Sequence, residues 1–225
     1  MKRNDILLLL FIFLLFAPFI LWQAAFEFYD SFNRNHGMLT SFIKFAILAT
    51  TGELIGLRIQ TGKYFKPGFG ILPRAIVWGF LGLAINAAFV IFAKGTPAFL
   101  MYMGLELNQN TFSNQLLTAF SISASMNLVF APVMMTFHKI TDTHIIQNQG
   151  TLKGFLKPIR FSEIFENLNW KVQWDFVFKK TIPFFWIPAH TITFMLPPQY
   201  RVLFAAILGI VLGVILAFAN QKTKK

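Results

Sequence analysis

The sequence predicts an all-α protein, a polytopic bundle of about six transmembrane helices in which proline interrupts the fifth span. The first observation is composition: 56% of the 225 residues are apolar, 13% are charged, and the mean hydropathy is +0.58. This balance lies far outside that of soluble domains. The second is a series of apolar runs about as long as a bilayer span. We interpret residues 1–225 as a single membrane domain with spans at about 6–26, 39–59, 75–93, 116–138, 182–197 and 201–219.

The first span follows a basic N-terminus, Met1-Lys2-Arg3. A secretory signal peptide would have a shorter apolar core and then a small-x-small cleavage site. Ala24–Ala25 fits such a site poorly, and the residues from Glu27 to Asp30 have the character of an interfacial border. We therefore favour a retained first span over a cleaved signal.

The second, third and fourth spans are less uniform. The second holds Lys44, Glu53 and Arg58, and the fourth is rich in serine and other small residues. We interpret residues 95–114 as a connection whose semi-apolar patch lies at the membrane interface. Residues 139–180 form the only long soluble stretch, and we expect them to be a cytoplasmic loop.

Within that loop, residues 161–180 have the pattern of an amphipathic helix. Phe161, Ile164, Phe165 and Leu168 recur at helical spacing, and tryptophan and lysine residues follow. An aromatic and basic amphipathic helix suits the cytoplasmic membrane interface. A short helix packed on the bundle would have the same pattern, and the sequence does not decide between the two. Topology accounts for the basic residues, so we expect no nucleic-acid partner.

The last two spans form a helical hairpin of two unlike arms. The second arm, 201–219, is smooth, whereas the first arm, 182–197, carries prolines and polar residues: Pro183, Pro188, His190, Thr193 and Pro197. Proline removes a backbone donor, and short proline-interrupted spans are the usual sign of a binding site or pathway in transporters. We expect the first arm, closed by Arg201, to shape such a pathway.

The distribution of basic residues orients the bundle. With the N-terminus inside the cell, all but four of the 20 Lys and Arg residues fall on cytoplasmic segments; the exceptions are Arg34, Lys44, Lys94 and Arg201. Cytoplasmic loops of membrane proteins collect Lys and Arg. The basic tail then requires both arms of the hairpin to cross. We expect an integral protein of the bacterial cytoplasmic membrane, surrounded by the lipid bilayer, with both termini in the cytoplasm.

Polar residues inside the spans are the candidates for a solute pathway: Glu53, Asn86, Asn127, His190 and Thr193. A charged group in hydrocarbon costs about 3 kcal/mol or more, so it usually faces the bundle interior or water. Glu53 therefore either lines a pathway or forms a structural ion pair with Arg58 or Arg74. His190 either gates a pathway or relays protons, or it only hydrogen-bonds a neighbouring helix.

Two stripes of small residues recur at every fourth position. In the fourth span, Ala119, Ser123 and Asn127 either let helices pack closely or line a narrow aqueous pore. In the last span, Gly209 and Gly213 form a GxxxG, a sign of tight contact with a helix of the same chain or of another copy. The second stripe is compatible with a homo-oligomer.

The sequence predicts no enzyme, cofactor or metal site. It has no Cys, and it lacks the common metal, nucleotide and hydrolase motifs. His138 and His144 flank Asp142 without a further motif, and the four histidines are too scattered to indicate a metal site.

The C-terminal half resembles the family that contains the mitochondrial inner-membrane protein Mpv-seventeen and peroxisomal membrane protein two. That family ends in a pattern close to W-P-x-x-Q-x-x-N-F-x-x-V-P-x-x-x-R before its last span. With one residue of difference in spacing, the matching positions are Trp186, Pro188, His190, Thr193, Phe194, Leu196, Pro197 and Arg201. His190 and Thr193 stand where the family has Gln and Asn.

Upstream, weaker motifs follow in the family's order. Gly52–Glu53 resembles its Gly-Asp, Gly95-Thr96-Pro97 resembles its Gly-Pro turn, and Asn127 and Pro132 have the spacing of its Asp-Gln-x4-Pro, with Met126 in place of the acid. The resemblance covers roughly residues 39–219. Members of the family are small helical membrane proteins proposed to be weakly selective pores for small solutes, with no known enzymatic activity, and the resemblance implies such a role here.

Two other functions compete with a solute pathway. If the polar residues only hold the helices together, the chain is a structural or scaffolding membrane protein with no transport activity. An enzyme acting on lipid is the third hypothesis.

Overall fold

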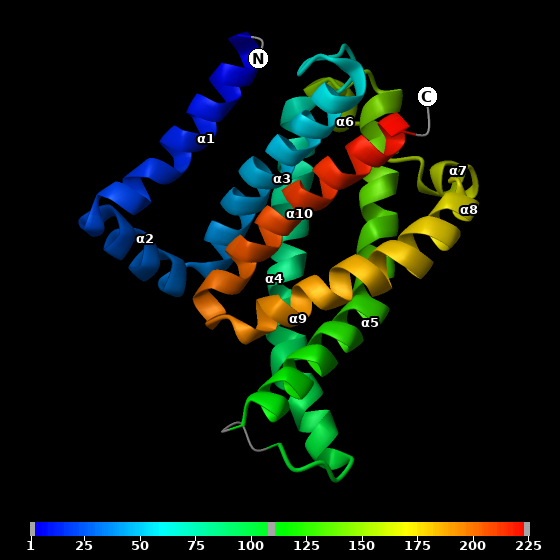
Figure 1. Cartoon of the computed structure of the whole chain (residues 1–225). Helices are drawn as coiled ribbons and strands as arrows, with labels where there is room; N and C mark the ends of the chain where they lie inside the picture. Colours follow the sequence, from blue (N-terminus) through cyan, green and yellow to red (C-terminus); the bar gives the residue numbers. More distant parts are fainter. Residues whose placement is uncertain (1–2, 108–110, 223–225) are drawn as a thin grey trace. The chain divides into compact units, whose positions relative to one another are not determined.

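A computed structural model describes residues 3–107 and 111–222 of the chain (Figure 1). The fold is all-α, with no strand in these two ranges. The helices are α1 (Arg3–Leu21), α2 (Gln23–Asn35), α3 (Gly37–Thr61), α4 (Ile71–Tyr102), α5 (Phe112–Gln147), α6 (Leu152–Phe155), α7 (Phe161–Glu166), α8 (Trp170–Val172), the π-helix η1 (Gln173–Trp186), α9 (Ile187–Met195) and α10 (Pro198–Lys222). The chain divides into two compact units, Met1–Thr40 and Ser41–Lys225.

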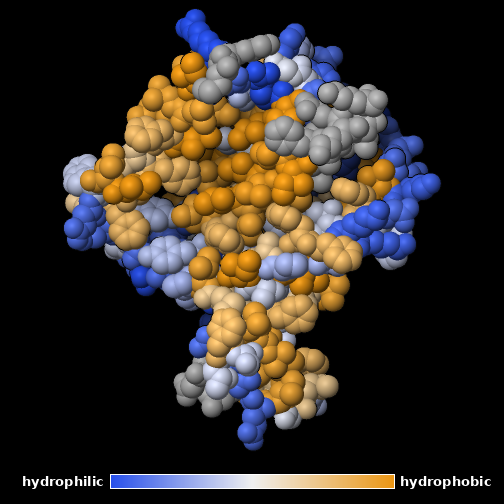
Figure 2. Space-filling view, viewed as in Figure 1, coloured by the Kyte–Doolittle hydropathy of each residue, from blue (hydrophilic) through white to orange (hydrophobic). Residues whose placement is uncertain are grey.

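Within the described residues, five helices are long and apolar enough to cross a membrane: α1, α3, α4, α5 and α10. The predicted spans 39–59, 75–93, 116–138 and 201–219 lie within four of them. Large apolar side chains such as Phe80, Leu128 and Val133 are exposed on these helices. On the face seen in Figure 2, apolar side chains gather over the middle of the second unit, and hydrophilic ones lie mainly at its rim. The protein is therefore an integral membrane protein.

The first unit consists of α1, α2 and the start of α3. The predicted span 6–26 does not form one helix, because α1 ends at Leu21 and α2 begins at Gln23 after Trp22, which is extended. The two helices meet through the rings of Phe19 and Tyr29, whose centroids are 5.0 Å apart. Apart from Ala17, the described side chains of α1 are exposed or half-buried, as expected of a helix surrounded by lipid.

In the second unit, α5 takes part in three apolar clusters. Ile145 packs with Val77 and Leu81 of α4, and Ala131 packs with residues of η1. Ile140, also on α5, packs with Ile164 of α7 and with Leu168. These contacts make α5 the central helix against which α4, α7 and η1 are placed.

The loop 139–180 does not contain one amphipathic helix over 161–180. The structure has the short helix α7, a break, and a new helix that begins at Trp170. Ile164 and Leu168 are buried against Ile140, while Phe161 and Phe165 are exposed. One side of this segment is therefore packed on the bundle, and its aromatic side remains uncovered.

The helix that contains the third predicted span, 75–93, is longer than that span. Residues 95–102 are not a connection with a Gly-Pro turn, since α4 continues through Gly95 and Pro97 to Tyr102. The hydroxyls of Thr96 and Ser125 lie 2.7 Å apart and join α4 to α5 at this level. A tertiary contact thus overrides the local tendency of glycine and proline to end a helix.

The predicted fifth span, 182–197, is helical up to Met195, but it is not among the five helices that are long and apolar enough to cross a membrane. It lies on the end of η1 and on α9, and the helix continues through Pro183 and Pro188. It ends only at Met195, after which Leu196 is extended and Pro198 begins α10. Proline disfavours helical geometry in the residue before it, which explains the sharp turn at Pro197 and Pro198.

Two glycines hold the loops at one end of the second unit together. Gly70 and Gly150 both have positive φ, and a Cβ built on Gly150 would lie 2.5 Å from the backbone nitrogen of Gly70. Only glycine combines this conformation with so close an approach. The α3–α4 loop is therefore joined to the end of α5.

Candidate functional site

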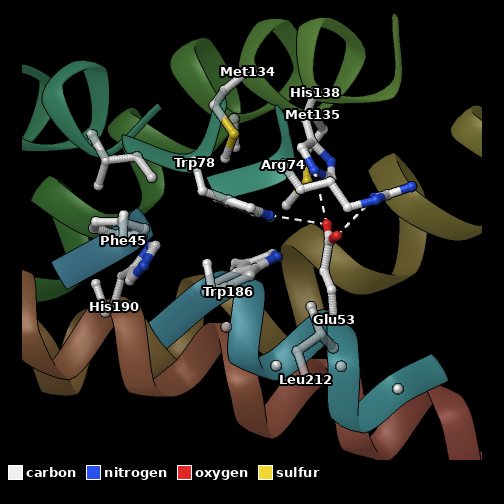
Figure 3. Close-up of a pocket in the computed structure, with 18 of the residues that line it drawn as sticks. Phe45, Glu53, Arg74, Trp78, Met134, Met135, His138, Trp186, His190 and Leu212 are labelled. Carbon is white, nitrogen blue, oxygen red and sulfur yellow. Dashed lines mark hydrogen bonds and ion pairs between the residues drawn. The ribbon is translucent and has the colours of Figure 1, made fainter. Parts of the chain in front are cut away.

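A cavity of about 470 Å³ lies among α3, α4, α5, η1, α9 and α10 in the second unit (Figure 3). Its volume is within the usual range of about 300–1,000 Å³ for small-molecule sites. Most of its wall is apolar and includes the rings of Phe45, Trp78, Phe89, Phe130 and Trp186. Polar side chains are few, and they gather in two places.

The first polar place is the carboxylate of Glu53, on α3. Its Oε2 accepts a hydrogen bond of 2.7 Å from Nη1 of Arg74, and its Oε1 accepts one of 2.9 Å from the indole N–H of Trp78. Nε2 of His138 lies 3.3 Å from the same Oε1. Glu53 therefore joins α3 to both α4 and α5, and of the two predicted ion-pair partners the structure selects Arg74.

Arg74 is buried, and each part of its guanidinium is engaged. Nε donates to the carbonyl of Phe69 at 2.7 Å, Nη1 pairs with Glu53, and Nη2 pairs with Asp142 of α5. The guanidinium carbon lies 4.3 Å from the centre of the Phe69 ring. Lys139, which is half exposed, lies 3.4 Å from Asp142. Two carboxylates and two cations thus meet at this end of the cavity.

The second polar place joins α5 to α9. Nδ2 of Asn127 lies 3.0 Å from Nδ1 of His190 and donates to the carbonyl of Ser123 at 2.9 Å. An amide NH₂ can only donate, so Nδ1 accepts and the ring proton of His190 is on Nε2. Ser123 in turn donates to the carbonyl of Ile187 at 2.7 Å, at the start of α9. Asn127 is 1% exposed, so the network is almost dry.

The structure brings together three of the five predicted pathway residues. Glu53, Asn127 and His190 all line the cavity. Asn86 is not among the residues that line it, and Thr193 is fully buried elsewhere, with its hydroxyl bonded to the carbonyl of Ala189 at 2.9 Å.

The predicted packing residues have different surroundings. Gly213 lies against α3, since a Cβ built there would be 3.6 Å from the carbonyl oxygen of Gly52. A Cβ on Gly209 would meet no other heavy atom within 4 Å, because this residue faces the cavity. Ala119 and Ser123 are both buried on α5.

Arg201 and Pro197 lie apart from this cavity. Arg201 donates to the carbonyls of Leu196 at 2.9 Å and Phe194 at 3.0 Å, and so satisfies the end of α9. Together with Ala119 and Pro197 it lines a second, more open hollow of about 650 Å³. We interpret Arg201 as a residue that fixes the turn between the two arms.

Sequence reasoning assigned no pathway role to Trp78, His138, Asp142 or Trp186. The spacing of Arg74 and Trp78, and of His138 and Asp142, puts each pair on one face of its helix. That spacing was a usable signal, because two side chains on one helix face can contact the same group. Arg74 and Trp78 both donate to Glu53, whereas His138 contacts Glu53 and Asp142 contacts Arg74. Trp186 was distinguished from the other tryptophans only as the first residue of the family-like C-terminal pattern, which does not indicate where its side chain lies.

Within the two described ranges, no group of three or more His, Asp or Glu side chains is placed to hold a metal ion. In comparisons with known proteins, no family model, no curated protein and no solved structure matches this chain.

Proposed function

We propose that this integral membrane protein provides a pathway for small solutes, and that the cavity of about 470 Å³ is the central section of that pathway. The observation that carries the proposal is the meeting of Glu53, Asn127 and His190, from three different helices, on one cavity among membrane-spanning helices. Polar groups are costly at this depth and commonly mark a route for solutes. We propose no enzymatic role.

The resemblance to the Mpv-seventeen family supports the same function. Two of its motifs, Gly52–Glu53 and the segment from Trp186 to His190, contribute residues to the cavity. As in that family, the solute would be small and the selectivity weak.

Flux into proteoliposomes tests the pathway. The purified protein is expected to carry a small neutral solute such as glycerol above the rate of protein-free liposomes, over several voltages and pH values. A Cβ at Gly209 would meet no other heavy atom within 4 Å, so Gly209→Leu is expected to fill part of the cavity and reduce flux to the protein-free level. Gly95→Leu is the matched control, because Gly95 also has open space around it but does not line the cavity. Absence of flux in every condition would contradict the proposal.

A scaffolding role is the second candidate, and one observation favours it. Asn127 and His190 bond to each other, and Glu53 bonds to Arg74, so these polar groups already stabilise helix contacts. If this is their whole role, flux is absent and Gly209→Leu leaves every property of the protein unchanged.

We also propose that both termini lie in the cytoplasm of a bacterial cell, which follows from the positions of the basic residues. Reporter fusions at residue 225 and in the loop 148–151 are expected to report the same, cytoplasmic side. Opposite sides would contradict this orientation.

A further inference from the structure

The walls of the cavity favour a flat, apolar molecule. Aromatic rings line it, among them Trp78, Phe89 and Trp186. α10 contributes Gly209 to its wall, where a Cβ would meet no other heavy atom within 4 Å, so backbone is exposed at this position. A wall of rings and glycine backbone accommodates a flat body better than a branched or hydrated one.

The charges at the cavity do not call for a charged ligand. Glu53 and Asp142 both pair with Arg74, and Lys139 adds a further contact to Asp142. Both oxygens of Glu53 already accept hydrogen bonds. A cationic or an anionic ligand would have to break one of these pairs to gain a partner, at the cost of leaving the other group unpaired.

Among the fully buried polar atoms of the described wall residues, one has no hydrogen-bond partner. The indole N–H of Trp186 is buried and has no hydrogen-bond acceptor among the described residues, and the whole side chain is 9% exposed. In Figure 3 its nitrogen points toward the side of the cavity where Glu53 lies. A buried donor without an acceptor costs free energy, which a ligand oxygen would recover.

The geometry points to a neutral, lipid-soluble solute with a flat apolar body and one hydrogen-bond acceptor oxygen, held with that oxygen against the Trp186 N–H. This inference rests on the proposed function, since it takes the cavity as the place where the solute is held. It narrows the solute to a chemical class, that of aryl ketones and similar compounds with one carbonyl group.

Four naphthalene probes of matched size test the class. They are 2-acetonaphthone, which is neutral with an acceptor; 2-ethylnaphthalene, which has none; 2-naphthylmethylammonium; and 2-naphthoate. Their binding to the full chain in lipid nanodiscs is measured by equilibrium dialysis, and uptake by protein-free nanodiscs is subtracted. The ketone is expected to bind saturably and more tightly than the other three probes. Equal binding of the hydrocarbon, or tighter binding of either ion, would overturn the inference.

Substitutions then locate the site. Trp186→Phe keeps the ring but removes the donor, and it is expected to lower ketone affinity about 2- to 10-fold while leaving the hydrocarbon unaffected. Trp174→Phe is the matched control on an exposed tryptophan outside the cavity. Gly209→Leu is expected to abolish saturable binding of the ketone. If Trp186→Phe does not alter the preference for the ketone, the assigned contact is wrong; if that variant does not fold, the wild type and Gly209→Leu still decide.

The binding experiment and the flux experiment can fail independently of each other. Saturable ketone binding without any flux would support this ligand class and contradict the pathway. Flux of glycerol that Gly209→Leu blocks, without ketone binding, would support the pathway and contradict the ligand class.

Discussion

Glu53 and Arg74 are joined by an ion pair of 2.7 Å that connects α3 to α4 inside the bundle. The Arg74 side chain is 8% exposed and that of Glu53 19%, so water screens the pair little. Because Arg74 also pairs with Asp142 of α5, a single guanidinium connects three helices. Arg74 therefore neutralises two carboxylates, so we expect its loss to destabilise the protein more than the loss of the Glu53 charge.

Arg74→Met is expected to lower the free energy of unfolding by about 3–5 kcal/mol, because it leaves Glu53 without its arginine and Asp142 with only the half-exposed Lys139. Glu53→Gln is expected to cost less, about 1–3 kcal/mol, since Arg74 keeps Asp142 and the amide oxygen can still accept from Trp78. Denaturant titration in detergent micelles measures both. Equal costs for the two variants would show that Asp142 contributes nothing.

Asn127→Leu is expected to destabilise the protein by about 1–3 kcal/mol, since Nδ1 of His190 loses its donor in a buried place. His190→Phe removes the other partner, and the double variant is expected to cost less than the sum of the two single variants. Strict additivity in this double-mutant cycle would mean that the 3.0 Å contact carries no free energy.

Gly82→Ala is expected to cost about 1–3 kcal/mol through overpacking. A Cβ at this position would lie 2.7 Å from both the Cβ of Phe45 and the carbonyl oxygen of Ser41, so α3 and α4 would have to separate. Gly95→Ala on the same helix is the control; it has open space and is expected to be neutral or stabilising. Equal melting temperatures of the two variants would contradict the close approach.

Arg201→Lys keeps the charge but loses the two-nitrogen contact with the carbonyls at the end of α9. The expected loss is about 1.5–3 kcal/mol in the free energy of unfolding. Arg34→Lys serves as the comparison, because the exposed pair of Arg34 and Asp30 contributes about 0–1 kcal/mol. A loss at Arg201 no larger than at Arg34 would remove its assigned role in fixing the turn.

Apolar periodicity was sufficient to predict the long helices, since lipid-facing helices must be apolar over a bilayer thickness whatever they pack against. The prediction of 39–59 agrees with α3 within a few residues. The prediction of a connection from residue 95 was wrong, because α4 continues past Pro97. There Thr96 contacts Ser125, a residue distant in sequence, and no local pattern reports such a contact. The break at Trp22 was missed because apolar residues lie on both sides of it and only Gln23 interrupts them before Glu27.

The candidate site was partly predictable. A carboxylate inside a span needs a partner, and this reasoning reached Arg74 as one of two choices. The choice between Arg58 and Arg74 depends on where α4 lies beside α3, which no local pattern encodes. Whether Trp78 and Trp186 line the cavity likewise depends on how α4 and η1 are rotated about their axes.

The ion pair of Glu53 with Arg74 also has a consequence for biosynthesis. Helix α3 is made first and carries Glu53, a residue that opposes entry into the bilayer when alone. Its cation arrives with α4, next in the chain, so the two helices should partition into lipid together as a hairpin. We expect a nascent chain truncated after residue 70 to insert α3 less efficiently than one truncated after residue 102, and Arg74→Met to abolish the difference.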